Sequence, residues 1–108
     1  MKRGDIIIVS ASGDYGKSRP AVVIQSDWLK ATDSVLAALM TSTIVEAPLY
    51  RLLLKPHAAN GLKTSSQIMI DKILALPRHK CGAVIGALDQ SNLLALNTML
   101  SVVIGLAD

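Results

Sequence analysis

Short runs rich in isoleucine, valine and leucine, each closed by glycine, proline or polar residues, constrain the fold of this chain most strongly. They span residues 5–10, 20–25, 34–40, 50–54 and 67–74. Such runs, rich in β-branched residues and bounded by turn residues, predict β-strands. Several short strands at close spacing are typical of a small barrel or sandwich.

The end of the chain follows a different period. The apolar positions Leu93, Leu96, Leu100 and Val103 recur at helical spacing, and Leu94, Met99 and Ile104 widen the stripe. Asp89 stands where an N-cap residue would accept a backbone N–H and complement the helix dipole. The chain is therefore predicted to be a strand-rich α+β protein with a C-terminal helix packed on its strands.

Length and composition limit the remaining possibilities. With 108 residues, 51% of them hydrophobic and 18% charged, the chain is expected to fold as one domain, residues 1–108. No apolar run approaches the roughly 20 residues that cross a bilayer, and the N-terminus lacks the apolar core of a signal peptide. A cytoplasmic protein with no membrane partner is expected. The single cysteine, Cys81, excludes an internal disulfide.

The apolar content and the charge bear on partners. So much apolar sequence in so small a domain favours a homodimer, in which a second copy covers part of the hydrophobic surface. A net charge of +3 is compatible with a polyanionic partner but is too small to name one.

The chain lacks the residues that several kinds of site require. His57 and His79 lie far apart, with no paired-cysteine or His-Glu-x-x-His pattern, so neither a metal site nor another cofactor is expected. The glycine-containing segment 13–18 lacks the spacing of a phosphate-binding P-loop. The aromatic residues, Tyr15, Trp28 and Tyr50, are too few for an extended base-stacking platform.

Short motifs in a fixed order resemble those of a known family. They are Lys2-Arg3-Gly4-Asp5 before the first strand, Lys17-Ser18-Arg19-Pro20 at the second, Met40-Thr41-Ser42 ending the third, and Ile70-Asp71-Lys72 in the last. Together with the terminal helix, the sequence resembles the MazF/PemK family of toxin endoribonucleases over almost its whole length. The resemblance implies an SH3-like antiparallel barrel with added helices and a homodimer. It also implies metal-independent cleavage of single-stranded RNA and neutralisation by a cognate antitoxin.

The resemblance also implies roles for individual residues. Arg19 and Thr41 match the family's usual catalytic pair, Asp71 stands where plasmid-borne relatives have a catalytic aspartate, and Asp14 falls where some relatives have a glutamate. The expected RNA contacts are Lys17, Ser42, Lys72 and Arg78. Many relatives carry a further arginine where this chain has the apolar Leu74, so Lys72 or Arg78 would have to supply that charge.

These residue types suit RNA cleavage by the substrate's own 2′-hydroxyl, which attacks the adjacent phosphorus and leaves a 2′,3′-cyclic phosphate. The planar guanidinium of Arg19 can hold two phosphate oxygens, and the Thr41 hydroxyl can donate to another. Asp71 is the first candidate for the base and Asp14 the second, although an aspartate is a weak base unless burial raises its pKa.

Other interpretations remain open. Arg19 could form a surface ion pair with Asp14, Thr41 could satisfy the end of a strand, and Asp71 could cap a turn. A related fold, typified by the CcdB proteins, poisons DNA gyrase by protein contact, and a non-catalytic SH3-like binding module would have the same barrel. His79, within Arg78-His79-Lys80, matches no motif of the family's site and is interpreted as part of a solvated charge cluster.

Overall fold

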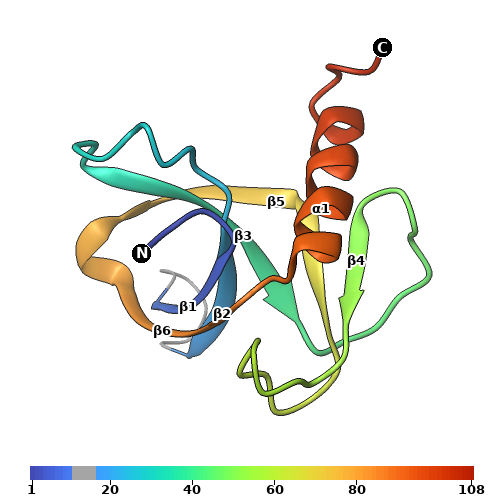
Figure 1. Ribbon diagram of the computed structural model, residues 1–108, viewed down its shortest axis with the longest axis horizontal. Helices are drawn as coiled ribbons and strands as arrows, with labels where there is room; N and C mark the ends of the chain where they lie inside the picture. Colours follow the sequence, from blue (N-terminus) through green and yellow to red (C-terminus); the bar gives the residue numbers. More distant parts are fainter. Residues whose placement is uncertain (11–16) are drawn as a thin grey trace.

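The chain folds into one six-stranded antiparallel sheet with a helix at its C-terminal end (Figure 1). The computed structural model describes residues 1–10 and 17–108. The strands are β1 Asp5–Ser10, β2 Ser18–Val23, β3 Ser34–Thr41, β4 Arg51–Leu54, β5 Ser66–Pro77 and β6 Cys81–Ala87, followed by α1 Gln90–Val103. A short 3-10 helix, η1 (Arg78–Lys80), joins β5 to β6. Across the sheet the order is β4-β5-β3-β2-β1-β6. The predicted strand-rich α+β fold is confirmed.

The predicted strands are all present, but β6 was missed and β5 runs beyond the predicted boundary to Pro77. The sequence of β6, CGAVIGA, is poor in the residues that favour strands. Its small residues have a packing reason, because a Cβ on Gly86 would lie 2.3 Å from the backbone carbon of Asn60. A loop lies directly on this edge strand, and only tertiary packing explains the glycine there.

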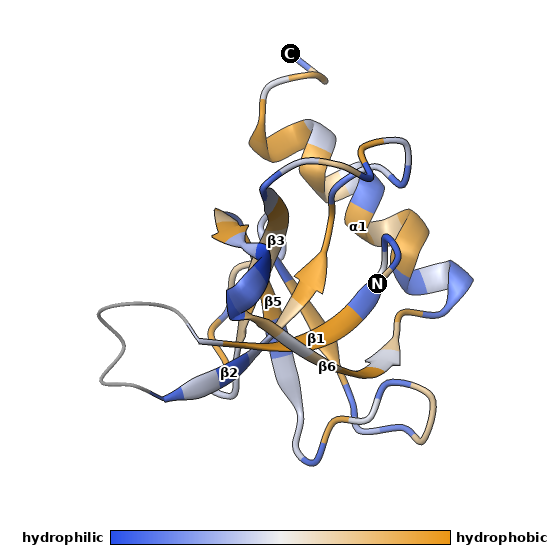
Figure 2. Cartoon of the chain, turned by 90° about the vertical axis from the view of Figure 1, so that its left-hand side faces the viewer, coloured by the Kyte–Doolittle hydropathy of each residue, from blue (hydrophilic) through white to orange (hydrophobic). Residues whose placement is uncertain are grey.

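Apolar side chains are buried on both faces of the central strands, which is why the sequence runs are nearly continuous rather than alternating. One buried cluster includes Val22, Met40, Ile68 and Leu96 and packs against α1. The other lies on the opposite face and comprises Ile7, Val9, Ala21, Val23, Val35, Ala37 and Leu76. The hydropathy view shows the helix lying against one side of the sheet, with hydrophobic residues in both (Figure 2).

The helix begins and packs largely as the sequence predicts. The Asp89 carboxylate accepts a hydrogen bond from the Asn92 backbone N–H at 2.8 Å, as expected of an N-cap. Leu96 is fully buried, but Leu94 and Ile104 are 55% and 56% exposed, so the expectation that they widen the buried stripe is wrong. The apolar face of α1 is therefore narrower than predicted. In the described part of the chain, no helix has the length and apolarity to cross a membrane.

Strand β5 bends halfway along its length. Its first half pairs with β4 and the end of β3, and its second half pairs with the beginning of β3. Its pairing with β3 changes register between Ala38↔Ile73 and Met40↔Ile68, so that residues 69–72 of β5 lie opposite the single residue Leu39. A bulge of this kind bends the strand that carries the extra residues. Beyond it, β5 curls and the chain returns through η1 and β6 alongside β1 (Figure 1). This curl covers the second buried cluster.

The Arg3-Gly4-Asp5 motif forms the turn that leads into β1. Gly4 has a φ of +90°, which L side chains rarely adopt, and its N–H donates to the Val23 carbonyl. The buried Asp5 carboxylate accepts from the Lys2 backbone N–H at 2.7 Å. The motif thus has a structural explanation within the residues described.

Candidate active site

One line of opposed residues crosses five strands at the end of β3. The pairs Val9↔Arg19, Thr41↔Gln67 and Gln67↔Leu53 are direct partners in neighbouring ladders. The β2–β3 ladder ends at Ala21↔Leu39, and continuing its register by two positions brings Arg19 opposite Thr41. Opposed residues in antiparallel strands share a face, with Cβ atoms about 4.5–5.5 Å apart. We call the line of Val9, Arg19, Thr41, Gln67 and Leu53 the cross-strand row.

Thr41 is held in an orientation that leaves its hydroxyl able to donate. Its Oγ1 accepts a hydrogen bond from the Thr43 N–H at 3.1 Å, and the side chain is half-buried at the last position of β3. A threonine hydroxyl carries one hydrogen and two acceptor lone pairs. Because the backbone N–H uses an acceptor position, the hydroxyl hydrogen remains available to a phosphate oxygen.

Gln67, the β5 member of the cross-strand row, fixes the segment that follows Thr41. This buried side chain accepts from the Val45 N–H at 3.1 Å and donates to the Val45 carbonyl at 2.8 Å. An amide bonded in this two-point manner imitates a strand pairing. It therefore anchors the chain four residues beyond Thr41 to the strand opposite it.

Arg19 is half-buried in β2, next to Pro20. Two of the expected RNA contacts lie at the same end of the sheet: Lys17 is exposed just before β2, and Ser42 is exposed just after Thr41. The structure thus brings these chemical groups to one sheet end from separate strands. A guanidinium, an ammonium and hydroxyl groups suit a phosphate ligand.

Two predicted residues lie in the bend of β5. Asp71 and Lys72 are both exposed, within the bulge opposite Leu39, which is two positions before Thr41 on β3. Because these residues lie in the bulge, the local bend of β5 determines their distance from the cross-strand row, and a regular strand register does not. Asp14, the other candidate base, lies outside the described residues, as does the ion pair considered for it with Arg19.

Arg78 lies at the other end of β3. Pro77 pairs with Ser34, the first residue of β3, and about 23 Å of strand separates Ser34 from Thr41. The Arg78 guanidinium holds the β2–β3 loop: Nε donates to the Thr32 carbonyl at 2.5 Å and Nη2 to the Lys30 carbonyl at 3.2 Å. These bonds give Arg78 a structural role at the end of β3 away from Thr41, whereas the sequence predicted it as an RNA contact.

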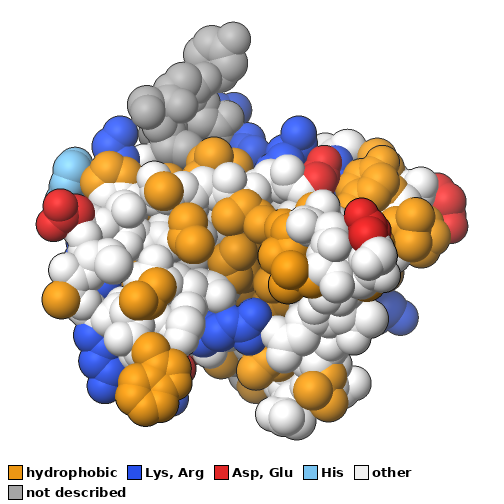
Figure 3. All heavy atoms as spheres, turned by 90° about the horizontal axis from the view of Figure 1, so that it is seen from above, with side chains coloured by type: hydrophobic (Ala, Val, Ile, Leu, Met, Phe, Trp, Pro, Cys, Tyr) orange, Lys and Arg blue, Asp and Glu red, His pale blue; other side chains and the backbone are white. Residues whose placement is uncertain are grey.

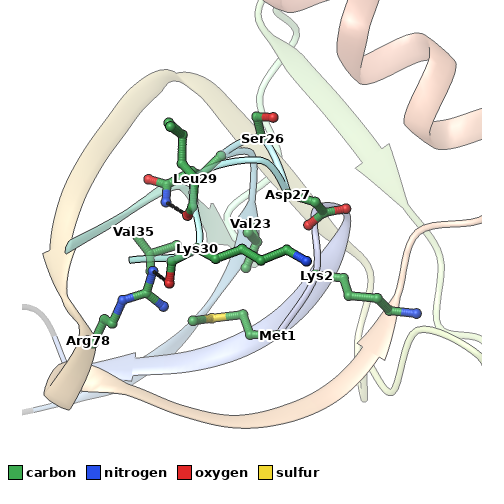
Figure 4. A pocket seen from close by; sticks show the side chains of 10 residues that line it. Met1, Lys2, Val23, Ser26, Asp27, Leu29, Lys30, Val35 and Arg78 are labelled. Atoms are coloured by element: carbon green, nitrogen blue, oxygen red, sulfur yellow. Dashed lines mark hydrogen bonds between the residues drawn. The ribbon is translucent and has the colours of Figure 1, made fainter. Parts of the chain in front are cut away.

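A cavity of about 440 Å³ opens beside Arg78. Lys2, Asp27, Lys30 and Val35 also line it, and Figure 4 shows their side chains around the opening. Since Val35 lies near the start of β3, this cavity and the cross-strand row occupy different ends of that strand. Leu74, at the position where the resemblance implied an arginine in many relatives, pairs with Ala37 and lies away from the row as well.

Cys81 offers no activated nucleophile. Burial raises the pKa of its thiol above the ordinary value, and the nearby Arg78 charge opposes that effect only in part. The thiol therefore stays protonated at neutral pH. Among residues 1–10 and 17–108, no cluster of three or more His, Cys, Asp or Glu side chains could hold a metal ion.

One cation beside the cross-strand row was not predicted from the sequence. Arg51, at the start of β4, donates from Nη1 to the Gln67 Oε1 atom at 3.3 Å. It lies ten positions after Thr41, and no motif marks it. Only the pairing of β4 with β5 and of β5 with β3 brings it to this part of the sheet.

The sequence of this chain is similar to known toxins along nearly its full length. The family described as the PemK-like, MazF-like toxin of type II toxin-antitoxin systems matches residues 2–104. A protein named "Probable endoribonuclease MazF", from Mycolicibacterium smegmatis, is 39% identical over 108 residues, covering 99% of each chain. This chain belongs to the PemK-like, MazF-like toxin family.

Solved structures agree with that assignment at the level of the fold. A mycobacterial endoribonuclease in complex with its cognate antitoxin matches this MazF-like toxin with a TM-score of 0.82 and 20% identity, covering 98% of this chain and 96% of the other. The Mycobacterium tuberculosis toxin MazF-mt6 gives 0.80 and 22%, covering 94% and 96%. Deinococcus radiodurans MazF gives 0.78 and 19%, covering 97% and 96%. The MazF-like fold expected from the sequence is therefore confirmed.

Proposed function

We propose that this MazF-like toxin cleaves single-stranded messenger RNA in the cytoplasm, without a metal, and that residues 1–108 act as one toxin domain. The observation that supports the proposal is the β2–β3 register, which, continued two positions beyond the last pair Ala21↔Leu39, puts Arg19 opposite Thr41. Two groups suited to one phosphate come from separate strands and share a face. The family assignment and the endoribonuclease name of the 39% identical relative support the same activity.

The proposed reaction uses the 2′-hydroxyl group of the RNA as its nucleophile. The 2′-oxygen forms a bond to the adjacent phosphorus, the bond from phosphorus to the 5′-oxygen breaks, and a 2′,3′-cyclic phosphate remains. In our proposal Arg19 donates two parallel hydrogen bonds to the phosphate oxygens, and Thr41 donates one more as negative charge builds. DNA resists because it lacks the attacking hydroxyl.

Two proton transfers complete the step. A base takes the proton of the 2′-hydroxyl, and an acid returns a proton to the departing 5′-oxygen. We assign the base to Asp71, which lies exposed in the β5 bulge, and keep Asp14 as the alternative. The exposed Lys17, Ser42 and Lys72 are proposed to contact the RNA on either side of the cut. Arg78 would contact RNA only if the strand extended toward the opposite end of β3.

We further propose that the toxin is a homodimer and that a cognate antitoxin neutralises it. A structural neighbour is an endoribonuclease in complex with its cognate antitoxin, and D. radiodurans MazF has also been solved with MazE. An acidic, initially flexible antitoxin segment would compete with RNA for the same positive charges, ordering as it binds.

Two other functions would use the same barrel without cleaving RNA. A CcdB-like toxin would poison gyrase through protein contact, and a binding module would hold RNA uncut. The matched relative is named an endoribonuclease, which favours cleavage over both rivals.

The decisive experiment is cleavage of a mixed-sequence RNA in EDTA. We expect discrete fragments with 2′,3′-cyclic phosphate ends from the wild type, and a loss of about 10²–10³ in rate from Arg19→Ala. Arg19→Lys should retain only part of the activity, because an ammonium cannot make the two parallel bonds. Circular dichroism would establish that each variant folds. If folded Arg19→Ala cut at the parental rate, the proposed phosphate clamp would be wrong.

A further inference from the structure

Arg51 lies on the same face of the sheet as the proposed catalytic pair. Leu53 pairs directly with Gln67, and Arg51 is two positions before Leu53, so the alternation of side chains places both on one face. Gln67 in turn pairs with Thr41. The hydrogen bond of 3.3 Å from Arg51 Nη1 to Gln67 Oε1 links this cation to the cross-strand row.

The surroundings of Arg51 leave its charge poorly compensated. The side chain is half-buried, and its Nε is buried with no hydrogen-bond partner among residues 1–10 and 17–108. Within the described residues, Gln67 supplies the guanidinium's one acceptor, at a distance near the upper limit for a hydrogen bond. A buried donor without an acceptor destabilises the folded state, and a guanidinium carries five N–H donors. The stability of the fold therefore does not explain why an arginine occupies position 51.

A bound anion would supply the hydrogen-bond acceptors and the negative charge that the fold does not provide for Arg51. A half-buried guanidinium with few partners binds a phosphate well, because the planar fork fits its oxygens and desolvation strengthens the attraction. β4 lies two strand spacings from β3, or about 10 Å. An RNA strand running along the cross-strand row would meet Arg19 at β2 and reach Arg51 near β4.

We propose that Arg51 binds a phosphate of the RNA strand beside the one that Arg19 and Thr41 hold. This inference rests on the proposed function and deepens it, because it fixes the path of the RNA across β2, β3, β5 and β4. Gln67 acts as a positioning residue: its amide oxygen holds Arg51, and its amide group anchors Val45 beyond Thr41.

The test measures binding separately from cleavage. The wild type first identifies a cut site, and the same oligonucleotide is then made with a 2′-deoxynucleotide at that position, so that it binds uncut. We expect Arg51→Met to weaken binding at least about tenfold. The slope of log K against log salt should become shallower by about 0.7, as for one lost phosphate contact in single-stranded RNA. Arg51→Lys should restore most of the slope, because the point charge remains.

Lys2→Met provides the matched control, because it removes the same unit of charge. Lys2 is exposed and lines the cavity at the other end of β3, so its loss should leave both affinity and salt slope near the wild-type values. The melting temperature of Arg51→Met should stay equal or rise, since an unpartnered buried donor has gone. Arg51→Gln, which keeps a donor toward Gln67 without the charge, replaces it if the methionine variant fails to fold.

Wild-type affinity and salt slope in a folded Arg51 variant would overturn the inference, with or without a lowered melting temperature. That result would leave the nuclease proposal standing, provided the wild type cuts RNA in EDTA. Failure of the wild type itself to cut would instead count against the proposed function.

Discussion

At the scale of single residues, the candidate site depends on which groups can hold or move a proton. Thr41 has a backbone N–H on its oxygen and so keeps its hydrogen to donate. Asp71 is an exposed carboxylate in a bend, free of the regular pairing that fixes Thr41 and Gln67. A general base must come within hydrogen-bond reach of the 2′-hydroxyl, and the exposure of Asp71 in the bulge leaves its carboxylate accessible to RNA.

Asp71→Asn should slow RNA cleavage by about 10²–10⁴, because general-base catalysis typically contributes that much. The measurement is the single-turnover rate of cleavage of one defined RNA by the folded wild type and variant. Asp33→Asn, an exposed change before β3, is the control and should keep the parental rate. A parental rate in Asp71→Asn would move the role to Asp14.

At the scale of elements, the helix and the first five strands follow local signals, while β6 and the bend of β5 depend on the segments that pack against them. The bulge at residues 69–72 lets one strand pair with β4 at its start and with the beginning of β3 at its end. The helix, by contrast, is defined by its own cap and stripe. Local changes should therefore affect α1 modestly and predictably.

Asp89→Ala should lower the free energy of unfolding by about 1 kcal/mol, because it removes the carboxylate that accepts from Asn92. Asp89→Asn should cost much less, since asparagine is an equally good N-cap. Thermal or urea unfolding of the two variants provides the comparison. Equal losses in both would show that the charge at the helix N-terminus matters more than the hydrogen bond.

At the scale of the whole molecule, apolar surface remains exposed after folding. Leu94, Val102, Ile104 and Leu106 are exposed on α1 and the segment after it, with Leu106 at 76%. The space-filling view shows hydrophobic side chains gathered over part of one face (Figure 3). Grouped apolar surface of this kind is typical of a protein–protein interface.

The toxin should have twice its protomer mass of 11.4 kDa in solution, as measured by sedimentation at several concentrations. The double change Ile104→Asp and Leu106→Asp should shift it toward the monomer, because two charges would have to lose water at the interface. Trp28→Ser is the control, since that side chain is 93% exposed in the β2–β3 loop, away from the helix. A monomer at every concentration of the wild type would contradict the dimer.

The sequence by itself determined where the first five strands and the helix begin or end to within a few residues. Its ordered motifs also identified Arg19 and Thr41 as candidate catalytic residues. Those inferences depend on hydrophobic runs, turn residues, caps and an ordered set of motifs, all of which act over short stretches of chain. It did not predict β6, where a loop packs against Gly86 and the β1 backbone lies close to Gly82.

Only the tertiary structure decided which side chains meet. Strand register and the β5 bulge bring Gln67 and Arg51 to the row with Thr41, and they carry Arg78 to the other end of β3. Pairing between strands distant in sequence depends on how all their buried faces fit at once. A one-residue slip in any ladder would turn a site residue to the opposite face, and no local pattern in the sequence records that choice.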